Sequence, residues 1–154
     1  MRAATRILAL DPGSKRVGVA LSDELGWTAQ PLETFERKSL AADLAHIKEL
    51  VSRHAVREIV IGMPVRMDGR VGPAAQAVQQ FLDAVQAAVG IPVTAWDERL
   101  TTKAAEQMLI EADVSRKKRK GAVDRVAAAL LLKSYLDHLS SLQPAADASA
   151  PDEA

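Results

Sequence analysis

The chain has 154 residues, which is enough for one domain with a substantial hydrophobic core. It contains no cysteine, which excludes disulfides and thiolate metal sites, and no apolar run approaches the roughly 20 residues that span a bilayer. Too little apolar sequence precedes Asp11 for a secretion signal, so we expect a cytoplasmic protein.

The formal net charge is zero, from 20 basic and 20 acidic residues, but the two signs are unevenly distributed. A continuous basic run consists of Arg116, Lys117, Lys118, Arg119 and Lys120. Residues 141–154 are acidic, rich in Ala, Pro and Ser, and without periodicity, so we expect a disordered tail after a single domain over 1–140.

The first third of the chain predicts three strands, over 6–11, 17–22 and 27–35. Residues 7–10 form an unbroken apolar run, typical of a strand that is buried on both faces. The third run contains Pro31, which favours an edge strand. Close spacing and turn residues between the runs indicate an antiparallel meander.

The remainder alternates helices and strands. Ser39 should cap a helix whose apolar stripe contains Leu40, Leu44, Ile47 and Val51. A strand over 57–63 follows, with a buried run at 59–61. The next helix should begin at Pro73 and end at Gly90. Its apolar face is predicted to contain Ala74, Ala77, Val78, Phe81, Leu82 and Val85.

A fifth strand is predicted over 91–96, then a helix capped by Thr101 or Thr102, and a long helix over 121–139. We expect Trp27 and Trp96 in the core or the sheet, and the three histidines at the surface or at helix ends. The order of elements predicts an α/β fold, with a mixed sheet and helices on its faces.

Carboxylates stand at three positions where chemistry is possible. Asp11 ends the first strand, Asp97 and Glu98 follow the fifth, and Asp124 begins the last helix at the head of an apolar stripe. A carboxylate at a strand end is fixed and still open to a ligand, which suits a divalent metal.

Each of these carboxylates also has a purely structural interpretation. Asp11 could cap the turn at Pro12-Gly13, and Asp124 could pair with Arg125 or Lys120. Asp97 and Glu98 are neighbours on a strand and point to opposite faces, so only one can easily meet Asp11. The alternation of side chains along a strand does not by itself decide whether Asp97 or Glu98 meets Asp11.

Four segments together resemble the YqgF family of ribonuclease-H-like, Holliday-junction-resolvase-like proteins, also described as pre-16S ribosomal RNA nucleases. They are Ile-Leu-Ala-Leu-Asp-Pro-Gly-Ser-Lys-Arg-Val-Gly-Val-Ala (7–20), Ile-Val-Ile-Gly-Met-Pro (59–64) with Met-Asp-Gly (67–69), Trp-Asp-Glu-Arg-Leu-Thr-Thr (96–102) and Lys-Gly-Ala-Val-Asp-Arg-Val-Ala-Ala (120–128). The resemblance covers about residues 6–139, with the motifs in order.

The resemblance implies a ribonuclease-H-like sheet of three antiparallel and two parallel strands. It also implies that Asp11, Glu98 and Asp124 converge as a catalytic, metal-binding cluster. Resolvases proper tend to supply a further acidic residue on the last helix and another at the strand 59–63, which here ends in Gly-Met-Pro. That departure leaves the number of metal ions open.

The chemistry fits the residues. Carboxylates holding Mg²⁺ or Mn²⁺ activate water and stabilise a leaving oxygen in phosphodiester hydrolysis. Phosphate contacts are expected from basic residues, which are Lys15, Arg16, Arg99 and the run Arg116, Lys117, Lys118, Arg119 and Lys120. The run could instead be a solvated loop.

The main hypothesis is a nuclease that processes the 5′ end of precursor 16S ribosomal RNA, as monomer or homodimer. RNA is the more expected partner, although a DNA junction resolvase or a non-catalytic RNA-binding factor in ribosome maturation or transcription is also compatible. A fourth hypothesis, a phosphotransfer ATPase, fits poorly because the chain has no room for the second domain that encloses a nucleotide.

Overall fold

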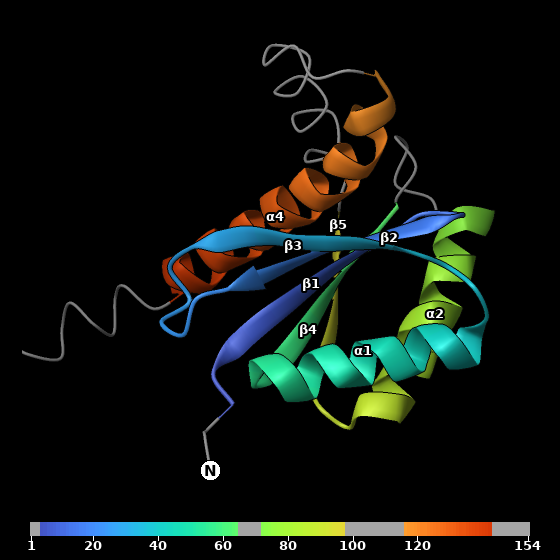
Figure 1. Ribbon diagram of the computed structural model, residues 1–154. Coiled ribbons are helices and arrows are strands. Elements are labelled where there is room, and N and C mark those ends of the chain that lie inside the picture. Colours follow the sequence, from blue (N-terminus) through green and yellow to red (C-terminus); the bar gives the residue numbers. More distant parts are fainter. Residues whose placement is uncertain (1–3, 65–71, 98–115, 143–154) are drawn as a thin grey trace, which may run out of the picture.

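A five-stranded sheet with helices on both faces forms the fold (Figure 1). The computed structural model of the chain describes residues 4–64, 72–97 and 116–142, with side chains of the last helix described from Arg125 onward. The strands are β1 Arg6–Pro12, β2 Arg16–Ser22, β3 Ala29–Glu36, β4 Val56–Met63 and β5 Val93–Asp97. The helices are α1 Leu40–His54, α2 Pro73–Val89 and α4 Arg116–Leu142.

The strand order is β3-β2-β1-β4-β5, which places β1 at the centre of the sheet. The hairpin strands β1, β2 and β3 pair antiparallel, whereas β1, β4 and β5 pair parallel. The predicted mixed sheet, with three antiparallel and two parallel strands, is therefore confirmed. Parallel neighbours at β1 and β4 bring the carboxyl ends of both strands to one edge.

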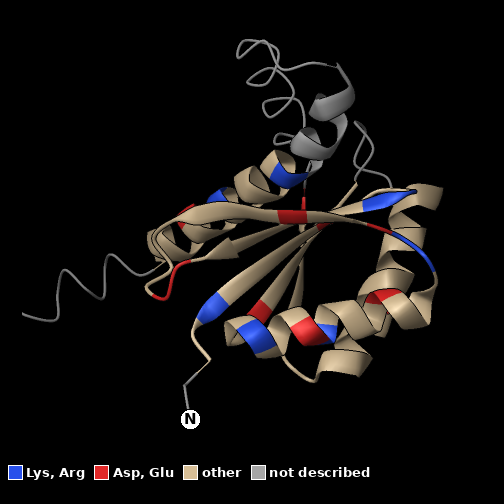
Figure 2. Ribbon diagram, viewed as in Figure 1, with Lys and Arg blue, Asp and Glu red and all other residues tan. Residues whose placement is uncertain are grey.

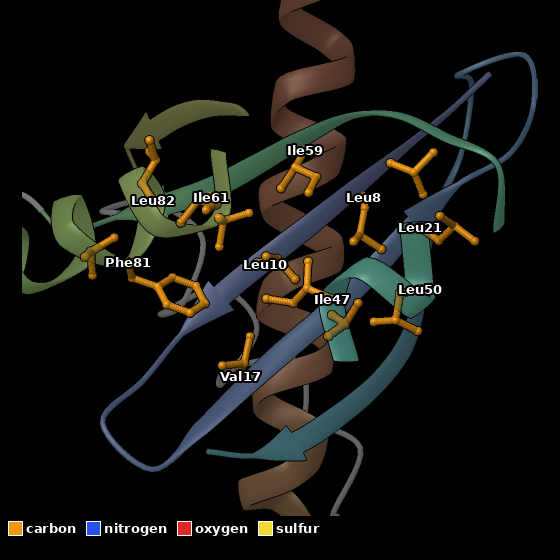
Figure 3. Packing of buried hydrophobic residues seen from close by; sticks show 14 residues of the cluster. Leu8, Leu10, Val17, Leu21, Ile47, Leu50, Ile59, Ile61, Phe81 and Leu82 are labelled. Carbon is orange, nitrogen blue, oxygen red and sulfur yellow. The ribbon is translucent and has the colours of Figure 1, made fainter. Parts of the chain in front are cut away.

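Strand β1 is buried on both faces, as its apolar run predicts. Leu8 and Leu10 contribute to a core cluster on the side of α1 and α2, where side chains such as Ile47 and Phe81 meet them (Figure 3). Ile7 and Ala9 contribute to a second cluster, under α4. Figure 1 shows α4 on one face of the sheet and the pair α1 and α2 on the other.

Strand β3 lies at the edge of the sheet, as expected from Pro31, but begins at Ala29. Its pairing with β2 shifts between Val19 and Ala20, beside Pro31, because proline cannot donate to the ladder. The expectation that Trp27 belongs to the core or the sheet is wrong: its side chain is 78% exposed. The backbone amide of Trp27 instead donates to Asp23 Oδ1, at 2.7 Å, in the turn before β3.

The helix boundaries follow from local signals. Ser39 caps α1 and accepts from the amide of Ala42 at 3.1 Å, while Pro73 begins α2 and Gly90 ends it with φ 70°. The predicted stripe of α1 is partly wrong, because Leu40 is exposed and Asp43 is buried. On α2 the predicted Ala74 and Ala77 are exposed and Ala75 is buried instead.

The last helix starts earlier than predicted. The periodicity predicts a start near Gly121, yet α4 begins at Arg116, so the backbone of the basic run 116–120 is helical. Lysine and arginine are good helix formers, and tertiary support from the buried stripe extends the helix past Gly121. The alternative that the run is a solvated loop is therefore wrong for its backbone.

Other predicted features lie outside the described residues. These are the helix after Thr101 or Thr102, and residues 143–154 of the predicted tail. Across the described ranges 4–64, 72–97 and 116–142, no helix has both the length and the apolar character needed to cross a bilayer.

The end of α1 generates a stability prediction. Ala55 has φ 54°, the only positive φ of a non-glycine residue in the described part of the chain. Because a Cβ is strained there, Ala55→Gly should raise the free energy of unfolding by about 0.5 to 1 kcal/mol in urea titrations. The matched change Gly90→Ala, where an added Cβ has open space, should lower it by about 1 kcal/mol through strain alone. An unaltered midpoint for both variants would contradict this account.

Candidate active site

Asp11 stands where the central strand leaves the core. It is half-buried, next to last in β1, and pairs with Gly18 of β2. Side chains alternate along a strand, so Asp11 shares the face of Ile7 and Ala9, which is the face that α4 covers. The prediction that Asp11 ends a buried strand is confirmed.

Glycines flank Asp11 in the sheet. Gly18 lies opposite it on β2, and on the other side Gly62 follows the pair formed by Leu10 and Ile61. Neither glycine has a side chain to occupy the space beside the carboxylate. The two strands beside β1 therefore contribute only backbone atoms at the level of Asp11.

The structure places Asp97 on the face away from Asp11. Trp96 packs against the cluster under α4, whereas Met63, the partner of Asp97 in the ladder, packs against the cluster under α1 and α2. Residues paired in a parallel ladder share a face. Asp97, which is exposed, is thus not on the side of Asp11, and Glu98 lies outside the described residues.

The buried stripe of α4 is confirmed from Ala127 onward. Ala127, Ala128, Leu131 and Tyr135 are each at most 6% exposed and lie on the sheet. The backbone of Asp124 belongs to the same helix, one turn before Ala127 and Ala128, but its side chain lies outside the described part. Figure 1 shows the first turns of α4 on the side of the sheet where β4 ends.

Polar contacts fix α4 to the sheet at its other end. The Tyr135 hydroxyl donates to the carboxylate of Glu58 on β4, and Trp96 Nε1 donates to Ser134 Oγ at 3.2 Å. The rings of Trp96 and Tyr135 also meet edge to face, with centroids 5.2 Å apart. Burial, together with the bond to Glu58, raises the pKa of Tyr135 above its ordinary value.

The tip of the β1–β2 hairpin is basic (Figure 2). Lys15 is exposed, and Arg16 begins β2 opposite Glu36 of β3. A surface hollow of about 300 Å³ is formed here by Ser14, Lys15, Arg16, Glu36 and Arg37. The structure thus brings two predicted phosphate-binding residues together, whereas Arg99 and the side chains of the run 116–120 lie outside the described residues.

Sequence reasoning missed Arg37 at this hollow. Its Nη1 donates to the carbonyl of Gly13 at 2.7 Å, and its guanidinium also lies near Asp43 and over the ring of Phe81. No motif contains Arg37, and its contacts come from three separate elements. Only the pairing of β2 with β3 could have placed it beside the hairpin.

A metal would find one of its three expected ligands in the described part of the site. Among described residues, no group of three acidic or histidine side chains is close enough to hold an ion. Asp11 has the donor type that Mg²⁺ and Mn²⁺ prefer, at a position where both neighbouring strands carry a glycine. The residues present fit such an ion, provided that Glu98 and Asp124 supply the remaining oxygens.

A family model described as Holliday junction resolvase, RuvX, matches residues 5–138. The chain belongs to the RuvX family. A relative from Moorella thermoacetica is 56% identical over 134 residues, 87% of this chain and 96% of that protein. One from Listeria monocytogenes is 52% identical over 136 residues, 86% of this chain and 97% of its own length. Both bear the name "Putative pre-16S rRNA nuclease".

Solved structures share the fold of this RuvX member. Thermus thermophilus RuvC in complex with a Holliday junction substrate has a TM-score of 0.57 at 18% identity, covering 89% of this chain and 97% of its own. The fowlpox virus Holliday junction resolvase has a TM-score of 0.54 at 13% identity, covering 87% and 99%. The predicted ribonuclease-H-like, resolvase-type fold and the family resemblance are thereby confirmed.

The contact between α4 and β4 can be measured directly, because Tyr135 is the only tyrosine of the chain. A raised pKa means that folding favours the neutral phenol, so this contribution to stability is present below the unfolded pKa and is lost as pH rises through the folded pKa. Alkaline titration of tyrosinate absorbance should give a higher pKa for native than for denatured protein. Glu58→Gln should reduce that difference, and equal values in the native and denatured states would contradict the contact.

Proposed function

We propose that this RuvX member is a divalent-metal-dependent nuclease that cleaves RNA, with precursor 16S ribosomal RNA as its substrate in the cytoplasm. The observation that carries the proposal is the position of Asp11. It ends a strand buried on both faces, has glycines on both sides, and lies on the face that α4 covers. The names of the relatives support ribosomal RNA as the substrate.

Glu98 and Asp124 complete the proposed cluster. Asp97 lies on the face opposite Asp11, so the next residue of a continuing strand would share the face of Asp11. Asp124 heads the stripe whose later members, Ala127 and Ala128, are buried on the sheet. The first argument continues β5 by one residue, and the second continues the buried stripe of α4 by one turn. Both would put a carboxylate near the carboxyl end of β1.

The three carboxylates would hold Mg²⁺ or Mn²⁺, which when bound polarises water and stabilises a leaving oxygen. Their own contribution is to fix the position of the ion and to keep its ligand set rich in oxygen, which disfavours softer metals. Three carboxylates close together would repel one another, so a bound cation would also stabilise the fold.

Basic residues on two sides of Asp11 would bind the phosphate backbone. Lys15 and Arg16 stand at the tip of the β1–β2 hairpin, shortly after Asp11, and Arg99 follows Glu98 in the sequence. On the other side, the run Arg116, Lys117, Lys118, Arg119 and Lys120 belongs to the first turns of α4, which precede Asp124. Such contacts position a substrate without reading its sequence.

A DNA junction is the second candidate substrate. The description of the family model and the fold shared with RuvC favour it. Contacts to phosphates do not distinguish RNA from DNA, because only groups near the 2′-hydroxyl do so. Purified protein should therefore be offered precursor ribosomal RNA and a four-way DNA junction in parallel, each with Mg²⁺ or Mn²⁺. We expect cleavage of the RNA; cleavage of the junction alone would reverse the assignment, and cleavage of neither would leave a binding factor.

Metal binding through Asp11 predicts a change in thermal stability. Mn²⁺ should raise the melting temperature of the wild type, because the ion relieves repulsion among the carboxylates. Asp11→Asn should reduce that rise. Asp83→Asn is the matched control, since Asp83 is exposed on α2, and it should respond as the wild type does. Equal responses of the Asp11 variant and the wild type would exclude Asp11 as a ligand.

Asp124 separates catalysis from binding. Asp124→Asn nearly preserves shape but removes one ligand charge, so cleavage should slow by about a hundredfold or more. RNA affinity, measured by fluorescence anisotropy, should hold or rise because a negative charge near phosphates has gone. Cleavage at the wild-type rate would show that the acidic cluster does not include Asp124.

A further inference from the structure

We propose that Arg37 is a positioning residue, which holds the hairpin next to Asp11 in the geometry that metal binding and cleavage need. The proposal rests on the nuclease function proposed above and adds a residue outside every motif of the sequence. Arg37 follows β3, and its contacts connect the β1–β2 turn with both helices of the opposite layer.

The turn itself is short and tight. The amide of Gly13 donates to the carbonyl of Arg16 at 2.8 Å, and a Cβ on Gly13 would lie 3.1 Å from that same oxygen. Arg37 satisfies two other carbonyls of the turn. Its Nη1 donates to Gly13 at 2.7 Å, and its main-chain amide donates to Lys15 at 2.8 Å.

Arg37 is in turn fixed from the other side. Its Nε lies 3.8 Å from Asp43 Oδ2, and the Asp43 side chain is only 5% exposed. Asp43, in the first turn of α1, also accepts from the amide of Lys38 at 3.1 Å, so its carboxylate is fixed by the segment that precedes the helix. The guanidinium carbon lies 4.9 Å from the centre of the Phe81 ring on α2. The side chain of Arg37 therefore connects the β1–β2 hairpin to the layer formed by α1 and α2.

This anchor acts close to Asp11. Only Pro12 separates Asp11 from Gly13, and proline fixes one of the backbone angles between them. Repulsion from the other proposed carboxylates would push Asp11 away, and a catalytic group must hold its place to about half an ångström. An anchor at Gly13 opposes that displacement.

Lysine could not replace this arginine. A guanidinium is a planar fork that can donate to the carbonyl of Gly13, face Asp43 and lie over Phe81 at once, whereas an ammonium is a compact point charge. Loss of the guanidinium would also leave the buried carboxylate of Asp43 without its cation. The conservative variant is therefore informative, because it keeps the charge and removes the bridge.

The test compares Arg37→Gln and Arg37→Lys with the matched control Arg53→Gln, since Arg53 is an exposed α1 residue paired with Glu49. We expect kcat on precursor RNA to fall about tenfold or more in Arg37→Gln and by a smaller factor in Arg37→Lys, while KM stays unchanged in both. The affinity of each variant for Mn²⁺ should fall by about the same factor as its kcat. Millimolar guanidinium should restore part of kcat in Arg37→Ala. A rise in KM at unchanged kcat would overturn the proposal, because it would make Arg37 a phosphate contact.

A second measurement does not depend on nuclease activity. Hydrogen exchange of the Gly13 amide should be about tenfold faster in Arg37→Gln than in the wild type and unchanged in Arg53→Gln. Wild-type exchange at Gly13 in the folded Arg37→Gln protein would overturn the anchoring. If exchange accelerates but the wild type neither cleaves nor binds Mn²⁺, the anchoring stands and the proposed function fails. Should Arg37→Gln not fold, the comparison of Arg37→Lys with the wild type decides.

Discussion

The arrangement depends on burying β1 on both of its faces. Residues 7–10 are fully buried, so no charged side chain can stand in that stretch without a large cost. The first position that tolerates a carboxylate is the point where the strand leaves the core, and Asp11 occupies it. Central placement of β1 then brings a hairpin to one side of this carboxylate and the end of β4 to the other.

Much of the fold could be predicted because its signals are local. Unbroken apolar runs mark β1 and the buried part of β4, and Pro73 and Gly90 limit α2. Pro31 correctly predicts an edge strand. Each of these depends on residues within a few positions of one another, so no knowledge of the tertiary structure was needed.

The features that sequence reasoning missed depend on distant partners. The choice between Asp97 and Glu98 needs the pairing of Met63 with Asp97, which no local pattern contains. Asp43 breaks the apolar stripe of α1 and is nevertheless buried, because the amide of Lys38 and the guanidinium of Arg37 compensate its charge. Glu98 and the side chain of Asp124 remain predictions, so the site itself is less determined than the fold around it.

The predicted start of α4 was also wrong, and the reason is physical. Gly121 suggests a helix start, because glycine weakens a helix interior, yet the helix continues through it. Ala128, Leu131 and Leu132 are almost fully buried against the sheet, and this packing outweighs one unfavourable residue. Tertiary contacts therefore place the start of the helix at Arg116, so that the basic run belongs to it.

The order of the chain has a consequence for biosynthesis. Ile7, Ala9, Ala20 and Val60 belong to elements that a ribosome makes early, but the helix that covers them is α4, made after all five strands. A nascent chain that has completed the sheet thus exposes one apolar face until α4 emerges, and such surfaces are prone to aggregation. Asp124 arrives with the same helix. The same helix therefore shields that face and supplies the proposed third ligand. A chain interrupted before α4 would be prone to aggregation and would lack Asp124.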